Sequence, residues 1–81
     1  MNNIFEYNGK DITMNVCIQI ELIADIIAKK DDITFLEALG KLYNSKTFKI
    51  LKQTENGLWA ESAEYIADRY YEEIDQIEDV G

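Results

Sequence analysis

The chain has 81 residues, a net charge of −8, one cysteine and no histidine. This length allows one small domain with a thin core, and the composition excludes a disulfide framework, a Ser-His-Asp triad and the usual zinc sites. An apolar fraction of 47% is typical of a globular protein rather than a disordered one. Together with the absence of proline, the helical periodicity described below predicts a single all-α domain over residues 1–81, built as a small bundle of about four helices.

The charge and the apolar segments also bear on location. The beginning of the chain, MNNIFEYNGK, has neither the basic segment nor the apolar run of a signal peptide. The most apolar segment, residues 16–28, contains Glu21 and Asp25 and is too short and too charged to span a bilayer. We therefore expect a cytoplasmic protein. Residues 53–81 hold nine acids and one arginine, so we expect no direct binding of nucleic acid or membrane by this region.

The first predicted element is a β-hairpin near the N-terminus. Asn8-Gly9 is a favoured two-residue turn, and short mixed apolar segments flank it. The strands would contain three or four residues each and would need support from the helices. An ordered arm or a loop is the alternative for residues 3–14.

A first helix is predicted over residues 13–30, and it is the most apolar of the chain. One row recurs at spacings of four, three and four residues: Val16, Ile20, Ile23 and Ile27. We expect Met14, Cys17 and Ile26 to widen this row, with Ile18 and Leu22 on its flanks. On this interpretation the helix is the centre of the core, and Cys17 fills space within it.

A second helix is predicted over residues 34–43. Thr34 and Glu37 have the spacing of a capping box. The residues expected to be buried are Phe35, Leu36, Leu39 and Leu42. Gly40 lies inside this helix at an energetic cost, which indicates a position of close packing.

A short third helix and a turn are predicted between the second and the last helix. Ser45 is a predicted cap for a third helix over residues 45–53, which would bury Phe48 and Leu51. Asn56-Gly57 predicts a turn, and the following Leu58-Trp59 would close one end of the bundle.

The last helix is predicted over residues 62–78, with Ser62 as its cap. Its apolar stripe consists of Ala63, Ile66, Ala67, Tyr70, Ile74 and Ile77. The opposite side carries a row of acids, namely Glu64, Asp68, Glu72, Asp75 and Asp79. We expect Tyr65 and Tyr71 to border this row, and Arg69 to reach Glu72 or Glu73.

The acidic row has two interpretations. It is either a solvated face that serves solubility, or a surface that binds a partner. Like charges four residues apart destabilise a helix, whereas interleaved lysines would stabilise it by about 0.2–0.5 kcal/mol per pair. The sequence gives up this stabilisation, which is an argument for a partner-binding surface, but a polar outer face is also what any helix exposed to water requires, so both interpretations stay open. The candidate residues of a partner-binding surface are Glu64, Tyr65, Asp68, Arg69, Tyr71, Glu72, Asp75 and Asp79.

Three classes of partner follow from such a surface. The first is another protein with a basic face, steered to the acids at long range. The second is a nucleic-acid-binding protein, which the acidic helix would block by imitating nucleic acid. The third is a second copy of this chain, joined through a lysine-rich middle segment containing Lys41, Lys46, Lys49 and Lys52. We expect no enzymatic activity, cofactor or metal. The sequence lacks a phosphate-binding loop, a set of metal ligands, and any histidine that could act as the base for a serine or cysteine nucleophile.

Two segments, LYNSKTFKIL (42–51) and ENGLWAESAEYI (55–66), resemble a pattern found in short bacterial proteins of uncharacterised function. The pattern is Tyr-x-Ser-x-Thr-aromatic, then a Thr-Gly-Leu-aromatic turn and a Ser-Pro start to an acidic last helix. The matching positions are Tyr43, Ser45, Thr47, Phe48, Gly57, Leu58, Trp59, Ser62 and Tyr65. Asn56 and Ala63 stand where the pattern has threonine and proline. The resemblance implies a helical, non-enzymatic accessory or antitoxin-like protein, and it implies no active site.

Overall fold

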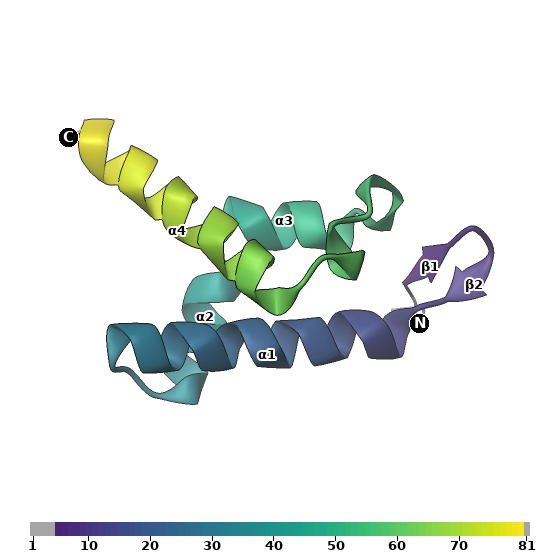
Figure 1. Ribbon diagram of the computed structural model, residues 1–81, viewed down its shortest axis with the longest axis horizontal. Coiled ribbons are helices and arrows are strands. Elements are labelled where there is room, and N and C mark those ends of the chain that lie inside the picture. Colours follow the sequence, from purple (N-terminus) through teal and green to yellow (C-terminus); the bar gives the residue numbers. More distant parts are fainter. Residues whose placement is uncertain (1–4, 81) are drawn as a thin grey trace.

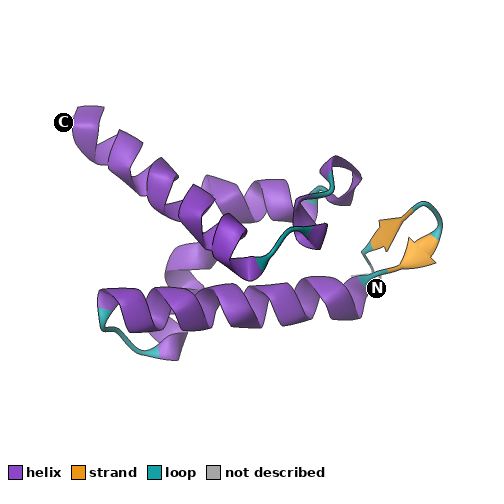
Figure 2. Cartoon of the chain, in the orientation of Figure 1, coloured by secondary structure: helices purple, strands orange, loops and turns teal. Residues whose placement is uncertain are grey.

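Four helices make up most of the molecule, and the structure, a computed structural model, describes residues 5–80, with side chains through residue 76. In chain order the elements are β1 (Glu6–Tyr7), β2 (Lys10–Asp11), α1 (Thr13–Asp31), α2 (Phe35–Tyr43), α3 (Lys46–Lys52), the 3₁₀ turns η1 (Thr54–Asn56) and η2 (Leu58–Ala60), and α4 (Ala63–Val80). The predicted all-α class is confirmed, and the four helices lie where the sequence predicts them (Figure 2). No helix among the described residues is long and apolar enough to cross a membrane.

The helices pack around α1, with α3 and α4 on one side of it and α2 behind it (Figure 1). The core lies where these elements meet. Its largest fully buried side chains are Val16, Ile23, Ile27, Leu42, Leu51 and Ile66. Toward its C-terminus α4 rises away from α1, so its last turns extend beyond the rest of the bundle (Figure 1).

The hairpin prediction is confirmed for residues 6–11, although each strand has only two residues. Asn8 and Gly9 both have positive φ, 54° and 78°, as a tight turn of this kind requires. The hydroxyl of Thr54 donates a hydrogen bond of 2.6 Å to the carbonyl oxygen of Glu6, and Tyr7 packs edge-on against Trp59. A two-stranded hairpin is marginal alone, and these contacts anchor it to the turns before α4.

Helix α1 places the predicted row in the core, with Ile20 half-buried and the other three members fully buried. The expectation that Met14 and Cys17 widen this row is wrong, because both side chains are exposed. Ala24 and Ala28 belong to the buried side of α1 instead. Helix α2 packs against α1, and Met14, Ile18 and Leu22 of α1 remain exposed.

The capping box at the start of α2 is confirmed. The backbone N–H of Glu37 donates to the Thr34 hydroxyl at 3.1 Å, and the Glu37 carboxylate accepts from the Thr34 N–H at 2.9 Å. Burial on this helix differs from the prediction, since Phe35 and Leu36 are exposed. Ala38 and Leu42 are its buried residues, and Leu36 lies on nearly the opposite side of the helix from Ala38.

Gly40 is also exposed, and a Cβ built at this position would meet no atom within 4 Å. The expectation of close packing at Gly40 is therefore wrong.

Side-chain hydrogen bonds define the segment between α2 and α4. The Ser45 hydroxyl accepts from the N–H of Phe48 at 3.1 Å and caps α3, as predicted. The indole N–H of Trp59 donates to the carbonyl oxygen of Thr54 at 3.1 Å. The side chain of Gln19 on α1 donates to the carbonyl oxygen of Trp59 at 2.8 Å. These bonds fix the two 3₁₀ turns against the start of α1 and set the point from which α4 begins.

Candidate functional site

Helix α4 presents the candidate acidic surface. The Ser62 hydroxyl accepts from the N–H of Tyr65 at 3.1 Å, which confirms the predicted cap. The residues that face the core are Ala63, Ile66, Ala67 and Tyr70. The four described members of the acidic row, Glu64, Asp68, Glu72 and Asp75, are all exposed. The fifth member, Asp79, has a side chain outside the described residues.

No cation of the described chain pairs with these acids. Among the described residues one ion pair is present, between Lys29 Nζ and Asp25 Oδ2 at 3.0 Å on α1. The predicted pairing of Arg69 with Glu72 or Glu73 is therefore not formed. The four carboxylates of the acidic row are exposed and form no ion pair with a described cation, although Lys46 and Arg69 line the same hollow as Glu72.

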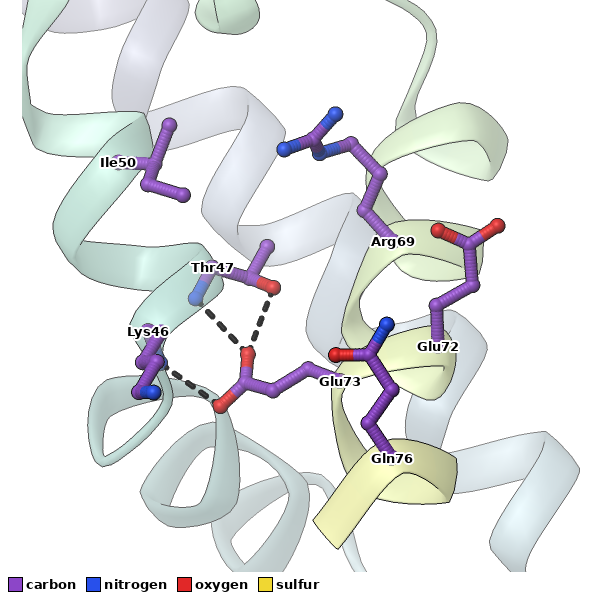
Figure 3. Close-up of a pocket in the computed structure, with 7 residues that line it drawn as sticks. All are labelled: Lys46, Thr47, Ile50, Arg69, Glu72, Glu73 and Gln76. Carbon is purple, nitrogen blue, oxygen red and sulfur yellow. Dashed lines mark hydrogen bonds between the residues drawn. The ribbon is translucent and has the colours of Figure 1, made fainter. Parts of the chain in front are cut away.

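Arg69 lies in a groove between α3 and α4. Its guanidinium extends from α4 toward α3 (Figure 3), and the side chain is half-buried. Two shallow hollows, of about 230 and about 200 Å³, meet along this groove, and both are lined by Ile50 and Arg69. Tyr65 lines the second hollow and keeps 45% of its surface exposed. The structure thus brings Tyr65 and Arg69 together beside the acidic row.

Tyr71 is half-buried and packs against the core. Its ring packs against Tyr70 with centroids 5.1 Å apart, and Lys30 Nζ of α1 lies 4.6 Å from its centroid. The Tyr71 hydroxyl is buried and forms no well-shaped hydrogen bond with the described residues. Burial, together with the nearby Asp31 carboxylate, raises the pKa of this hydroxyl strongly. Tyr71 therefore contributes to the α1–α4 contact, and its predicted part in binding a partner stays a prediction.

Glu73 has a structural role that the sequence reasoning missed. Its carboxylate accepts hydrogen bonds from the N–H of Lys46 at 2.9 Å and from both the N–H and the hydroxyl of Thr47, at 2.9 and 2.8 Å (Figure 3). Partial burial raises the pKa of Glu73, but these hydrogen bonds outweigh it and hold the pKa below its ordinary value. The carboxylate thus satisfies free N–H groups in the first turn of α3.

A signal for this role exists in the sequence. At 100° per residue, Glu73 falls on the apolar side of α4, between Ile66 and Tyr70 on one flank and the acidic row on the other. An acid in that position is expected to have a hydrogen-bonded partner within the fold. The partner itself, Thr47, lies 26 residues away in the sequence, so the local pattern around Glu73 does not identify it.

The chemistry available to this surface is electrostatic recognition. Solvated carboxylates on a helix can attract and orient a cationic surface. The described residues contain no group of three or more His, Cys, Asp or Glu side chains suited to a metal ion. Comparison with known proteins finds no matching family model and no significantly similar curated protein or solved structure. The resemblance of residues 42–51 and 55–66 to short bacterial proteins therefore stays a prediction.

Proposed function

We propose that this protein is a non-enzymatic protein-binding module of the antitoxin or inhibitor kind, which presents α4 to a basic face of another protein. The observation that carries the proposal is the row of Glu64, Asp68, Glu72 and Asp75. All four carboxylates are exposed, and none pairs with a cation among the described residues.

Three physical features support this function. Like charges at a four-residue spacing destabilise a helix, and the free energy of binding a cationic partner would offset this loss of stability. Four carboxylates of one sign on one side of the molecule attract a cationic partner over distances of about a Debye length, ~10 Å at 0.1 M salt. Next to them, the half-exposed ring of Tyr65 offers the kind of aromatic contact that often dominates binding energy.

Paired charge reversals test the proposal. The double variant Asp68→Lys with Glu72→Lys alters the row, and the control Glu6→Lys with Glu55→Lys alters exposed acids outside it. Both variants bring the net charge from −8 to −4, so a general charge effect would change both equally. The wild-type chain would be used to capture proteins from a lysate of the native cell. The affinity of each captured protein for the wild type and for the two variants would then be measured by calorimetry.

The expected result is one partner that binds the wild type and the control with similar affinity and the row variant at least ten-fold more weakly, a change of about 1.4 kcal/mol. Equal binding by the row variant and the control would contradict the proposal, provided circular dichroism shows that both are folded.

Imitation of nucleic acid is a second candidate, favoured by the regular spacing of the row. Carboxylates four residues apart rise about 6 Å along the helix axis, on the scale of the spacing between backbone phosphates. This function predicts that the captured partner is itself a nucleic-acid-binding protein and that duplex DNA or RNA competes with α4 for it. A partner that binds nucleic acid and this chain simultaneously would contradict imitation while leaving the protein-binding module intact.

A further inference from the structure

The outer side of α3 is positively charged. Lys46, Lys49 and Lys52 follow one another at a spacing of three residues, and all three are exposed. The residues that α3 buries, Thr47 and Leu51, lie on the other side of the helix. Residues three apart are neighbours on a helix surface, so the lysines form a row along α3. The one ion pair of the described residues lies on α1, so none of these lysines is paired with a described acid.

The charge of this row is unusual within the chain. Residues 38–52 hold four of the eight cationic residues and no acid, although the net charge of the whole chain is −8. The helix dipole favours Lys49 and Lys52, which lie in the last turn of α3, but it disfavours Lys46 in the first turn. Neighbouring like charges also repel one another, and α3 has only seven residues. The row therefore reduces the stability of α3, and a bound anionic partner would offset this loss.

Two aromatic rings adjoin the lysine row. Lys52 Nζ lies 5.1 Å from the centroid of the Phe48 ring, and the Tyr43 ring packs edge-on against Phe48 with the two centroids 4.7 Å apart. Phe48 is half-buried, whereas Tyr43 keeps 48% of its surface exposed. Tyrosine is one of the residues that most often dominate binding energy. Tyr43 and the three lysines together form one surface, the lysine face.

We propose that the lysine face binds an acidic segment of another protein, one that carries an apolar side chain next to its carboxylates. Carboxylates three or four residues apart on a partner helix repeat at about 5–6 Å. The lysines of α3 repeat at the same interval, so such a helix can pair with the whole row. Because exposed ion pairs contribute little each, the contact with Tyr43 supplies much of the affinity, and this contact requires the apolar residue.

The size and the charge of the molecule favour an acidic protein segment over nucleic acid. The row rises about 9 Å along the helix from Lys46 to Lys52 and offers three cations, whereas affinity for nucleic acid grows with the number of phosphates neutralised. The net charge of −8 also repels a polyanion at long range. A segment with two or three carboxylates meets the lysines at contact distance, where salt screens the more remote acids.

Nuclear magnetic resonance titration of the full chain with synthetic probes tests the proposal. The first probe is a peptide of six glutamates followed by two leucines, the second is the six glutamates alone, and the third is oligothymidylate of similar charge. The amide signals of α3 and of Tyr43 are expected to shift with the first peptide. This peptide should bind at least three-fold more tightly than the second, and added salt should weaken both.

Paired substitutions locate the binding. Lys46 lines a hollow together with Glu72, whereas Lys49 and Lys52 do not line it, so the test uses the latter two. Lys49→Gln with Lys52→Gln is expected to weaken binding of the first peptide at least five-fold. The control, Lys10→Gln with Lys29→Gln, removes the same charge from exposed lysines outside the face and is expected to change the affinity less than two-fold.

Tyr43→Ala tests the apolar contact. This variant is expected to lose the preference for the peptide with leucines. Tyr65→Ala is the matched control, because Tyr65 keeps a similar 45% of its surface exposed but lies on α4, and it is expected to keep the preference. Circular dichroism establishes that every variant is folded. The variant Asp68→Lys with Glu72→Lys should bind the peptides no more weakly than the wild type, so a failure of the acidic row and a failure of the lysine face are distinguishable.

Four results would overturn the proposal. The first is the absence of any shift at millimolar peptide. The second is equal weakening by the two pairs of lysine substitutions, which would make the binding a general effect of charge. The third is oligothymidylate binding at least as tight as that of the first peptide, which would assign the face to nucleic acid. The fourth is a shift of signals on both α3 and α4 with the concentration of the chain alone, which would assign the face to a second copy.

Discussion

The carboxylate of Glu73 on α4 accepts two hydrogen bonds from Thr47 on α3, one from its backbone N–H at 2.9 Å and one from its hydroxyl at 2.8 Å. Thr47 is buried, and α3 contains only seven residues. A helix this short is unstable by itself in water. Glu73 supplies the negative charge that favours its N-terminus and ties α3 to the helix that carries the candidate surface.

Glu73→Ala is expected to lower the free energy of unfolding by about 1–2 kcal/mol, because the buried Thr47 hydroxyl and two N–H groups lose a charged acceptor. Glu73→Gln should cost less, since an amide oxygen can still accept. Glu72→Ala is the matched control, one residue away and exposed, with an expected change within about 0.5 kcal/mol. Urea unfolding measures all three, and equal losses for Glu73→Ala and Glu72→Ala would show that the contact contributes nothing.

The lowered pKa of Glu73 predicts a dependence of stability on pH. A carboxyl whose pKa is lower in the folded than in the unfolded state stabilises the fold fully above its ordinary value, here 4.5, and loses this contribution as the pH falls through the folded-state pKa. The stability difference between the wild type and Glu73→Gln should therefore be constant near neutral pH and shrink below pH 4.5.

Urea midpoints of the two proteins across this range provide the measurement. Hydrogen bonds from Thr13 and Thr34 likewise lower the pKa values of Asp11 and Glu37. These carboxyls are common to both proteins, so their effect cancels in the difference. A difference that grows toward low pH would mean that the hydrogen bonds favour the protonated carboxyl.

Local signals account for the part of the fold that the sequence predicts. The capping box at Thr34 and Glu37, the cap at Ser45 and the turn at Asn8-Gly9 each depend on residues within a few positions of one another. Such contacts form wherever the segment is placed in the fold. The positions of the helices and the hairpin can therefore be predicted from short segments of the sequence.

The missed features depend on which sides of the helices meet. Helix α1 is apolar on more than one side, so periodicity alone does not decide whether Met14 faces the core or solvent. The packing of the other helices against the side of α1 that carries Ala24 and Ala28 decides it, and Met14, Ile18 and Leu22 are left exposed. Similarly, the exposed row on α4 follows from the helical repeat, whereas the burial of Tyr71 depends on the position of α1.

Gly40→Ala is expected to raise the free energy of unfolding by about 1 kcal/mol, because alanine favours the helix and loses less entropy on folding. Gly40 lies within α2, and the space around its Cα is open. Gly57→Ala gives the contrast: its φ of 78° is unfavourable for alanine, so that variant is expected to lose about 1 kcal/mol. Thermal unfolding of both variants measures the difference. A destabilised Gly40→Ala would mean that this position contacts another surface, for example in an assembly.

Asp68→Lys is expected to stabilise the chain by about 1 kcal/mol while it weakens binding to a basic partner. Asp68 is exposed and has Glu64 and Glu72 four residues away on either side, so the lysine converts two like-charge pairs into two opposite pairs. Asp68→Gln is the control, because it removes the repulsion without adding attraction and its helix propensity is close to that of lysine. The free energy of unfolding of the lysine variant should exceed that of the glutamine variant by about 0.5 kcal/mol at low salt, and the excess should vanish near 1 M salt, where the Debye length is about 3 Å.

Thermal unfolding at two salt concentrations measures the effect on stability, and calorimetry on the captured partner measures the effect on binding. A gain in stability with unchanged binding would make the acidic row a matter of solubility, whereas a gain in stability coupled to lost binding would show that the chain gives up helix stability for recognition.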